Sequence, residues 1–186
     1  IILKDADLET VVSGAMCSIF LNQGQMCTAM SRILVEEKIY DKFVDSFVNK
    51  VKRIKLGNAL DFETQIGPLI SEAQRKKVIA CVEKAKKQGV KLAWGGKIPQ
   101  DADLKNGFFF EPAVFVNVNP KDGIFQEEVF GPVVCISKFS SLEEAVRLAN
   151  ANIFALASCI WTANLNLAKS LAKKIDAGII WINTYG

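Results

Sequence analysis

VVCISKFSSLEEAVRLANANIFALASCIWTANLNLAKSLAKKIDAGIIWI, residues 133–182, is the stretch that decides the expected fold. It alternates three strand-like runs with two segments of helical spacing. In chain order these are residues 133–139, 141–150, 156–161, 164–175 and 178–182. The strand-like runs are apolar along their whole length, which is typical of parallel strands covered by helices on both faces. The pattern therefore predicts an α/β fold, a three-layer α/β/α domain with a largely parallel sheet.

The same alternation continues toward the N-terminus. Helical spacing and capping residues predict helices at 5–20, 37–54 and 71–88. β-rich runs predict further strands at 32–35, 90–94, 108–110 and 113–118. Polar and glycine-containing stretches predict loops at 22–30, 56–70 and 97–107. A single domain of ordinary size accommodates all of these elements.

The composition is that of a globular protein. Half of the 186 residues are hydrophobic and 23% are charged, with 23 Lys and Arg against 20 Asp and Glu, a net charge of +3. The basic residues lie on apparent helix faces, which favours solvated surfaces over a nucleic-acid footprint. No apolar run approaches the ~20 residues of a membrane span, and the first residues lack a signal-peptide pattern. We therefore expect neither a nucleic-acid nor a membrane partner.

The cysteines and the absence of histidine limit the possible chemistry. Five cysteines, at positions 17, 27, 81, 135 and 159, form no Cys-x-x-Cys pair, so neither a disulfide framework nor a zinc site is predicted. Reduced thiols indicate a cytoplasmic location. All except Cys27 lie in apolar runs and are expected to be buried. Without histidine, Cys–His and Ser–His pairs are excluded within the chain, and no metal site is expected.

Cys27 stands apart from the other cysteines. It ends the run Asn22-Gln-Gly-Gln-Met-Cys27, which follows an expected helix and precedes an expected strand. Gly24 permits unusual backbone angles, and backbone N–H groups in such a loop can stabilise an oxyanion. A cysteine there is accessible to substrate, whereas a core cysteine is inert. The local residues leave two readings open, a nucleophile or another small packing residue.

A set of further motifs favours the first reading. The Asn22–Cys27 run with Ser31-Arg32 resembles the catalytic-cysteine signature of the aldehyde dehydrogenase family, and Gln126-Glu-Glu-Val-Phe-Gly-Pro-Val133 resembles its cofactor-contacting segment. Other stretches similar to family landmarks are 55–58, 67–70, 149–150, 154–157 and 178–183. They occur in the family's order over essentially the whole chain. Phe154 and Ala155 depart from the family pattern, which has tyrosine and glycine there.

The resemblance implies a mechanism for Cys27. Its thiolate attacks an aldehyde to form a thiohemiacetal, hydride passes to NAD or NADP, and water hydrolyses the resulting thioester to a carboxylic acid. The Cys27 backbone N–H is one donor to the oxyanion. The substrate partner would be a small-molecule aldehyde.

The resemblance also assigns three cofactor-binding residues, each with a simpler alternative. Glu128 is expected to accept hydrogen bonds from the ribose beside the nicotinamide; alone, it reads as a surface glutamate. Phe130 is expected to lie against the nicotinamide ring, or else to belong to the core. Lys77 matches a lysine near the ribose, although a solvated basic face with Arg75 and Lys76 also explains it. Asn183 matches an asparagine that orients backbone near the site.

Several parts of the family's machinery are expected outside residues 1–186. A general-base glutamate, the second oxyanion donor and most of the dinucleotide-binding domain belong upstream, and the oligomerisation strand belongs downstream. Residues 1–186 are therefore interpreted as the nucleophile-bearing fragment of a catalytic domain. We expect this fragment alone to be inactive and the full-length protein to be a homo-oligomer.

The substrate and the exact reaction stay open at this point. Residues 103–112 and 181–185 resemble the betaine-aldehyde and aminoaldehyde dehydrogenase branch. One alternative is an acylating aldehyde dehydrogenase, or another acyl transferase, that passes the thioester to coenzyme A. A second is a non-catalytic α/β interaction domain.

Overall fold

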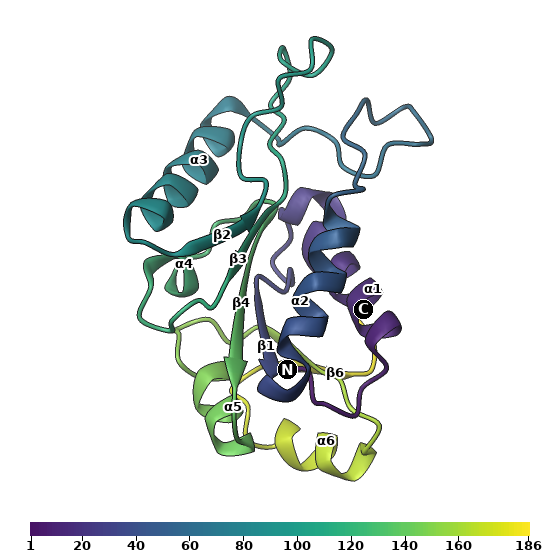
Figure 1. Cartoon of the computed structure of the whole chain (residues 1–186), viewed down its shortest axis with the longest axis vertical. Helices are drawn as coiled ribbons and strands as arrows, with labels where there is room; N and C mark the ends of the chain where they lie inside the picture. Colours follow the sequence, from purple (N-terminus) through teal and green to yellow (C-terminus); the bar gives the residue numbers. More distant parts are fainter.

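The computed structural model describes all residues, 1–186, and its strands form a mainly parallel sheet (Figure 1). Four strands run in the order β1-β4-β3-β2, and two more pair as β5-β6. Their bounds are β1 Arg32–Glu36, β2 Lys91–Trp94, β3 Ala113–Val116, β4 Val133–Phe139, β5 Ala157–Ile160 and β6 Ile179–Ile182. All pairs are parallel except β2 with β3, which is antiparallel.

The first residues of the chain join the two groups of strands. Ile2 forms a parallel bridge with Val35 of β1 on one side and with Trp161, just after β5, on the other. The Ile2 N–H donates to the Leu34 carbonyl oxygen at 2.8 Å, and the Leu3 N–H donates to the Trp161 carbonyl oxygen at 3.0 Å. The strand order is therefore continuous from β2 at one edge to β6 at the other.

Helices cover both faces of this sheet. Helices α1 (Leu8–Phe20) and α2 (Glu37–Val51) pack on one face, in a core that includes Val134 of β4. The opposite core includes Cys135 of the same strand. It is covered by α3 Glu72–Lys87, α4 Gly123–Gln126, α5 Leu142–Ala149 and α6 Leu165–Ala172. Because side chains alternate across a strand, β4 feeds both cores, and the predicted three-layer α/β/α fold is confirmed.

Capping side chains fix where the main helices begin. Asp7, Ser71, Ser141 and Asn164 precede α1, α3, α5 and α6, and each side chain accepts a hydrogen bond from the backbone N–H three residues on. These caps satisfy N–H groups that have no partner within the helix. None of the helices is both long enough and apolar enough to cross a membrane.

Two expectations from the sequence are wrong in detail, and one short helix is not predicted by it. Residues 108–110 form no strand. The run is apolar because Phe109 and Phe110 are buried, and not because it belongs to a sheet. The four-residue helix α4 is not foreseen, because so short a segment carries no periodicity. Cys17 is exposed and Cys81 only half-buried, since each lies on a helix whose buried stripe excludes it.

Candidate active site at the Cys27 cleft

Cys27 lies between α1 and β1 in a loop with an unusual backbone path; we refer to residues 22–27 as the Cys27 loop. A 3-10 turn, Leu21–Gly24, follows α1 directly. Asn22, Gln23 and Gly24 have left-handed φ angles of 51°, 59° and 70°. Non-glycine residues rarely adopt such angles, and those that do cluster at functional sites. The chain reverses here and leaves Cys27 exposed.

The Cys27 loop packs against residues 128–131, hereafter the 128–131 segment. A β-carbon on Gly24 would lie 2.2 Å from the Gly131 carbonyl oxygen, so only glycine fits between them. Gly131 is confined as well, because a β-carbon on it would lie 2.5 Å from Val78 Cγ2 on α3. Phe130 has a left-handed φ of 57°. Both segments therefore have strained backbones that the surrounding contacts must hold.

A cleft of about 340 Å³ opens where these two segments meet residues 153–157. Cys27, Glu128 and Phe130 all line it, so the structure brings three of the four predicted site residues together. Twelve of its 18 lining residues are hydrophobic. A largely apolar cleft with a few polar groups is typical of a small-molecule site.

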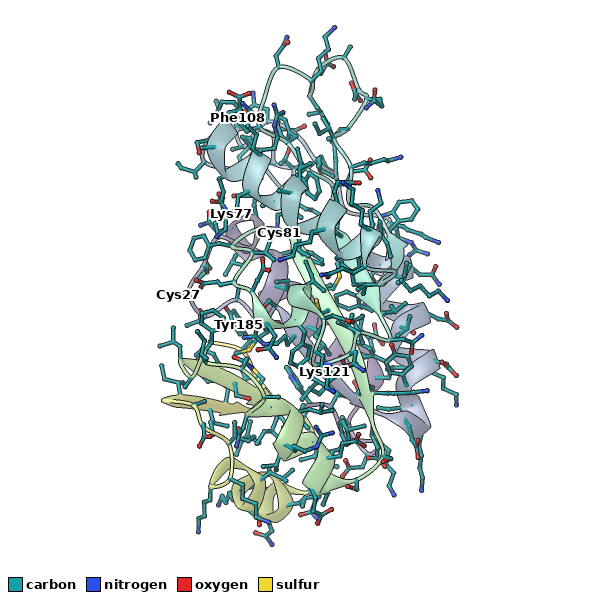
Figure 2. All side chains as sticks on the ribbon, turned by 90° about the vertical axis from the view of Figure 1, so that its left-hand side faces the viewer. Cys27, Lys77, Cys81, Phe108, Lys121 and Tyr185 are labelled. Atoms are coloured by element: carbon teal, nitrogen blue, oxygen red, sulfur yellow. The ribbon has the colours of Figure 1, made fainter.

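Lys77, the fourth predicted residue, does not line the cleft but touches its wall. It lies on α3, and its Nζ donates to the Glu128 carbonyl oxygen at 3.1 Å. Figure 2 shows Lys77 and Cys27 on the same side of the molecule. The Lys77 ammonium is therefore close enough to contact a ligand that reaches Glu128.

The neighbours of Lys77 on α3 differ from one another. Lys76 is exposed and pairs with Glu72 at 3.2 Å, as a solvated helix face predicts. Arg75 is half-buried, its Nη1 donates to the Gly107 carbonyl oxygen at 2.7 Å, and its guanidinium lies 5.6 Å from the centre of the Phe108 ring. The expectation of a solvated face is therefore wrong for Arg75, which anchors the loop before β3.

Arg32 is a cleft residue that the sequence marks only as part of a motif. Its guanidinium carbon lies 5.9 Å from the ring centre of Phe125 and 5.5 Å from that of Phe154, and its Nη1 donates to the Phe125 carbonyl oxygen at 3.1 Å. Burial lowers the pKa of Arg32, while the Glu128 carboxylate opposes this shift. A lone arginine carries no pattern that could have predicted this placement. The Phe154 ring lies against the guanidinium on the cleft side.

Three of the other four cysteines differ from Cys27 in being buried or half-buried. Burial raises the pKa of Cys135 to about 12 and that of Cys159 to about 11. The pKa of Cys81 is also raised, by burial first and then by Glu127, whose Oε2 lies 3.7 Å from its sulfur. No group of three His, Cys, Asp or Glu side chains is placed to hold a metal ion.

The end of the chain approaches the Cys27 loop from another direction. Asn183 has a left-handed φ of 56°, and its side chain exchanges two hydrogen bonds of 2.9 Å with the Thr162 backbone, which orients the turn after β6. The Tyr185 ring stands edge-on to Trp181 at 5.2 Å. The Tyr185 hydroxyl lies 3.1 Å from Thr28 Oγ1, one residue beyond Cys27.

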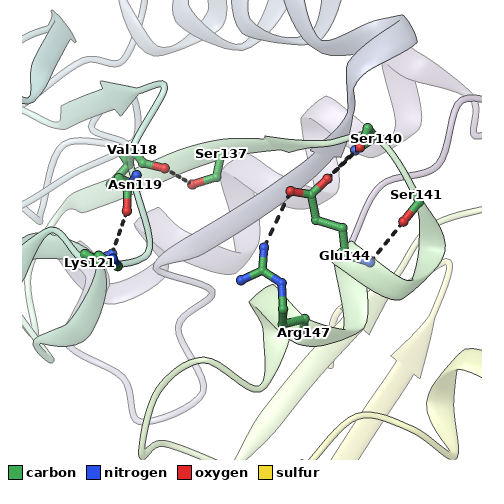
Figure 3. Close-up of polar contacts among 8 residues, drawn as sticks. All are labelled: Val118, Asn119, Lys121, Ser137, Ser140, Ser141, Glu144 and Arg147. Carbon is green, nitrogen blue, oxygen red and sulfur yellow. Dashed lines mark hydrogen bonds and ion pairs between the residues drawn. The ribbon is translucent and has the colours of Figure 1, made fainter.

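A second hollow, of about 410 Å³, lies between the loop after β3 and α5 (Figure 3). It is polar but offers no thiol. Its carboxylate, Glu144, is engaged locally: it accepts from the Ser140 N–H and hydroxyl at 2.8 and 2.7 Å and pairs with Arg147 at 3.5 Å. The Cys27 cleft is the better candidate for chemistry.

An α/β domain with an exposed thiol, a carboxylate and an aromatic ring in one cleft agrees with the family that the motifs resemble. The profile described as the aldehyde dehydrogenase family matches residues 1–186, and the chain belongs to that family. Among its relatives, the betaine aldehyde dehydrogenase of Bacillus subtilis is 46% identical over 185 residues. The betaine aldehyde dehydrogenase of Mesorhizobium japonicum is 40% identical over the same length.

Solved structures give the same answer. An apo point mutant of the betaine aldehyde dehydrogenase of Staphylococcus aureus superposes with a TM-score of 0.98 at 43% identity, covering 100% of this chain and 37% of that one. The NAD+ complex of the S. aureus enzyme gives the same values. The chain also spans only 38% of the length of each of the two curated relatives.

Proposed function

We propose that the full-length protein oxidises an aldehyde to a carboxylic acid, with Cys27 as the nucleophile and NAD+ as the hydride acceptor. The observation that carries this proposal is the single cleft lined by Cys27, Glu128 and Phe130. Family membership supports the reaction class. In the S. aureus relative, NAD+ is bound and one cysteine is found both BME-modified and BME-free, which supports NAD+ as cofactor and an accessible thiol.

The chemistry of Cys27 follows from its exposure and its backbone. Its thiolate adds to the aldehyde carbon, a C–S bond forms, and the carbonyl oxygen becomes the oxyanion of a thiohemiacetal. The Cys27 N–H has no acceptor within the protein, which leaves it free to donate to that oxyanion. Loss of hydride leaves a thioester on Cys27, and water then releases the acid and the thiol.

The residues of the cleft wall fit a nicotinamide cofactor. The Glu128 carboxylate lines the cleft and has no hydrogen-bond or ion-pair partner in the protein, so it is free to accept two hydrogen bonds from a ribose diol. Lys77 would hold the same ribose, and Phe130 would limit where the nicotinamide ring rests. Bound NAD+ supplies the hydride acceptor.

Glu128 is the only carboxylate that lines the cleft, and the chain has no histidine. With Glu128 assigned to the ribose, we place the general base for thioester hydrolysis outside these 186 residues. Residues 1–186 then act as the thiol-bearing part of a catalytic domain and are expected to be inactive alone. A cytoplasmic homo-oligomer is part of the same proposal.

A small cationic aldehyde such as betaine aldehyde is the proposed substrate. The named relatives support it. The edge-on rings of Trp181 and Tyr185 lie beside the Cys27 loop, and aromatic faces attract quaternary ammonium groups.

The test is NADH formation by the full-length protein with betaine aldehyde. Cys27→Ala should abolish it. Cys17→Ala, also at an exposed cysteine, should leave it unchanged and is the matched control. Equal activity of the two variants would contradict the proposal, and so would inactivity of the unmodified protein, which favours a non-catalytic role. Acyl-CoA formed in place of free acid when coenzyme A is added would show the acylating reaction instead.

A further inference from the structure

We propose that Gln25 and Gln74 are positioning residues that close a ring of contacts between the Cys27 loop and the 128–131 segment. The ring makes the placement of the thiol depend on the placement of the cofactor-facing residues, and the reverse. The catalytic role of these two residues rests on the proposed function, whereas the contacts themselves do not depend on it.

The first part of the ring ties the Cys27 loop to the chain before α3. Gln25 Oε1 accepts a hydrogen bond from the Ile70 N–H at 3.0 Å. With its amide oxygen facing Gly67, the Gln23 side chain accepts from the Gly67 N–H at 3.1 Å. Ile70 is followed at once by Ser71, the N-cap of α3. The two glutamine side chains therefore connect the thiol's loop to the start of that helix.

The second part ties α3 to the 128–131 segment. Gln74 Nε2 donates to the Phe130 carbonyl oxygen at 2.7 Å and to the Val129 carbonyl oxygen at 3.1 Å. Phe130 holds a left-handed φ that favours glycine, so its backbone needs such an external restraint. One half-buried amide thus holds two successive carbonyl groups. Neither bond reaches the Cys27 loop.

The third part closes the ring. Gly131 follows the carbonyl groups that Gln74 holds and lies in direct backbone contact with Gly24 of the Cys27 loop. A displacement of the 128–131 segment therefore has two routes to the thiol, directly through Gly24 and around the ring through Gln74 and Gln25. Because these contacts are continuous, loss of Gln74 should affect the reactivity of Cys27, and loss of Gln25 should affect the cofactor-facing 128–131 segment.

The test compares Gln74→Leu and Gln25→Leu with the unmodified full-length protein. The readout for Gln74→Leu is the rate of Cys27 alkylation by iodoacetamide without cofactor, relative to Cys17 in the same sample. Releasing the 128–131 segment should loosen the Cys27 loop and raise this ratio about fivefold. The readout for Gln25→Leu, which does not touch Glu128, is NAD+ affinity, which should weaken by a similar factor.

The matched control is Asn150→Leu. The Asn150 side chain also makes two bonds to backbone, to the Lys174 carbonyl oxygen at 2.9 Å and from the Asp176 N–H at 3.0 Å, but none within the ring. It should leave the alkylation ratio and NAD+ affinity unchanged. A partly unfolded variant is recognised separately, because the buried Cys135 and Cys159 then also become alkylated. Gln74→Asn, a shorter amide, is the milder second variant if Gln74→Leu fails to fold.

Either of two results would contradict the proposed coupling through the ring of contacts. One is an alkylation ratio that stays the same or falls in both Gln74 variants; the other is unchanged NAD+ affinity in Gln25→Leu. Failure of the proposed function is recognised separately, because Cys27→Ala would then leave NADH formation intact while the alkylation result still stands.

Discussion

Gly24 and Gly131 touch backbone to backbone, and an added β-carbon would clash at either position. A β-carbon on Gly24 would meet the Gly131 carbonyl oxygen at 2.2 Å, and one on Gly131 would meet Val78 Cγ2 at 2.5 Å. The contact joins the loop that presents Cys27 to the segment that presents Glu128. The distance between the thiol and the proposed ribose ligand is therefore set by two glycines.

Gly24→Ala should destabilise the protein and disable the site together. Its φ of +70° costs an alanine about 1 kcal/mol, and the clash is with backbone, which cannot rotate away. We expect a loss of more than about 2 kcal/mol in urea unfolding and at least a tenfold lower turnover. Gly89→Ala is the control: its φ is +81° but no atom lies within 4 Å, so it should lose about 1 kcal/mol and retain activity.

Gly131→Ala should be rescued by a second change. Its β-carbon meets a side chain, Val78, and not backbone, so removing that side chain makes room. Val78→Ala alone should lose about 1–3 kcal/mol, because Val78 is fully buried on α3. The double variant should lose less stability than the sum of the two single variants' losses, and its turnover should recover. Strict additivity in urea unfolding would show that the clash is relieved elsewhere.

The fold was largely predictable because its signals are local. Ser71, Ser141 and Asn164 cap their helices where the sequence places them, and the run 133–139 is a strand over those residues. The insertion of Ile2 between β1 and β5 was not foreseen, because it depends on pairing between segments that are distant in the sequence.

The sequence predicts which residues form the site better than it predicts their geometry. The motifs pointed to Cys27, Glu128 and Phe130, and one cleft contains all three. The sequence does not predict the left-handed turn at Asn22 or the contacts of two phenylalanine rings with Arg32. Both arise from packing between distant segments, which leaves no periodicity in the sequence.

Thiol reactivity should follow burial. At pH 8, iodoacetamide should modify Cys17 and Cys27 first, since both are exposed. Cys81 should react more slowly, because its raised pKa leaves less thiolate. Cys135 and Cys159, with pKa values of about 12 and about 11, should react only after unfolding. Peptide mapping over time gives the order. Early modification of Cys135 would contradict the packing of β4.

The buried Cys135 thiol should make the protein sensitive to alkali. Its pKa rises from 9.0 in the unfolded reference to about 12 in the fold, so the folded state binds a proton that the unfolded state releases. This stability is fully present below pH 9 and is lost as the pH rises toward 12, with a slope of up to about 1.4 kcal/mol per pH unit. Cys135→Ser, which does not titrate there, should flatten the alkaline limb of urea unfolding. Cys17→Ser, at an exposed thiol, should not.

Tyr185 should distinguish a cationic aldehyde from a neutral one. Its ring stands edge-on to Trp181, and its hydroxyl contacts Thr28 beside Cys27. If the ring attracts a trimethylammonium group, Tyr185→Ala should lower kcat/KM for betaine aldehyde about tenfold more than for 3,3-dimethylbutanal, its uncharged analogue of the same shape. Tyr185→Phe keeps the ring and loses the bond to Thr28, so it should retain the preference and match Thr28→Val in any loss of turnover. Equal losses for both aldehydes in Tyr185→Ala would mean that the ring supports the Cys27 loop and does not select the charge.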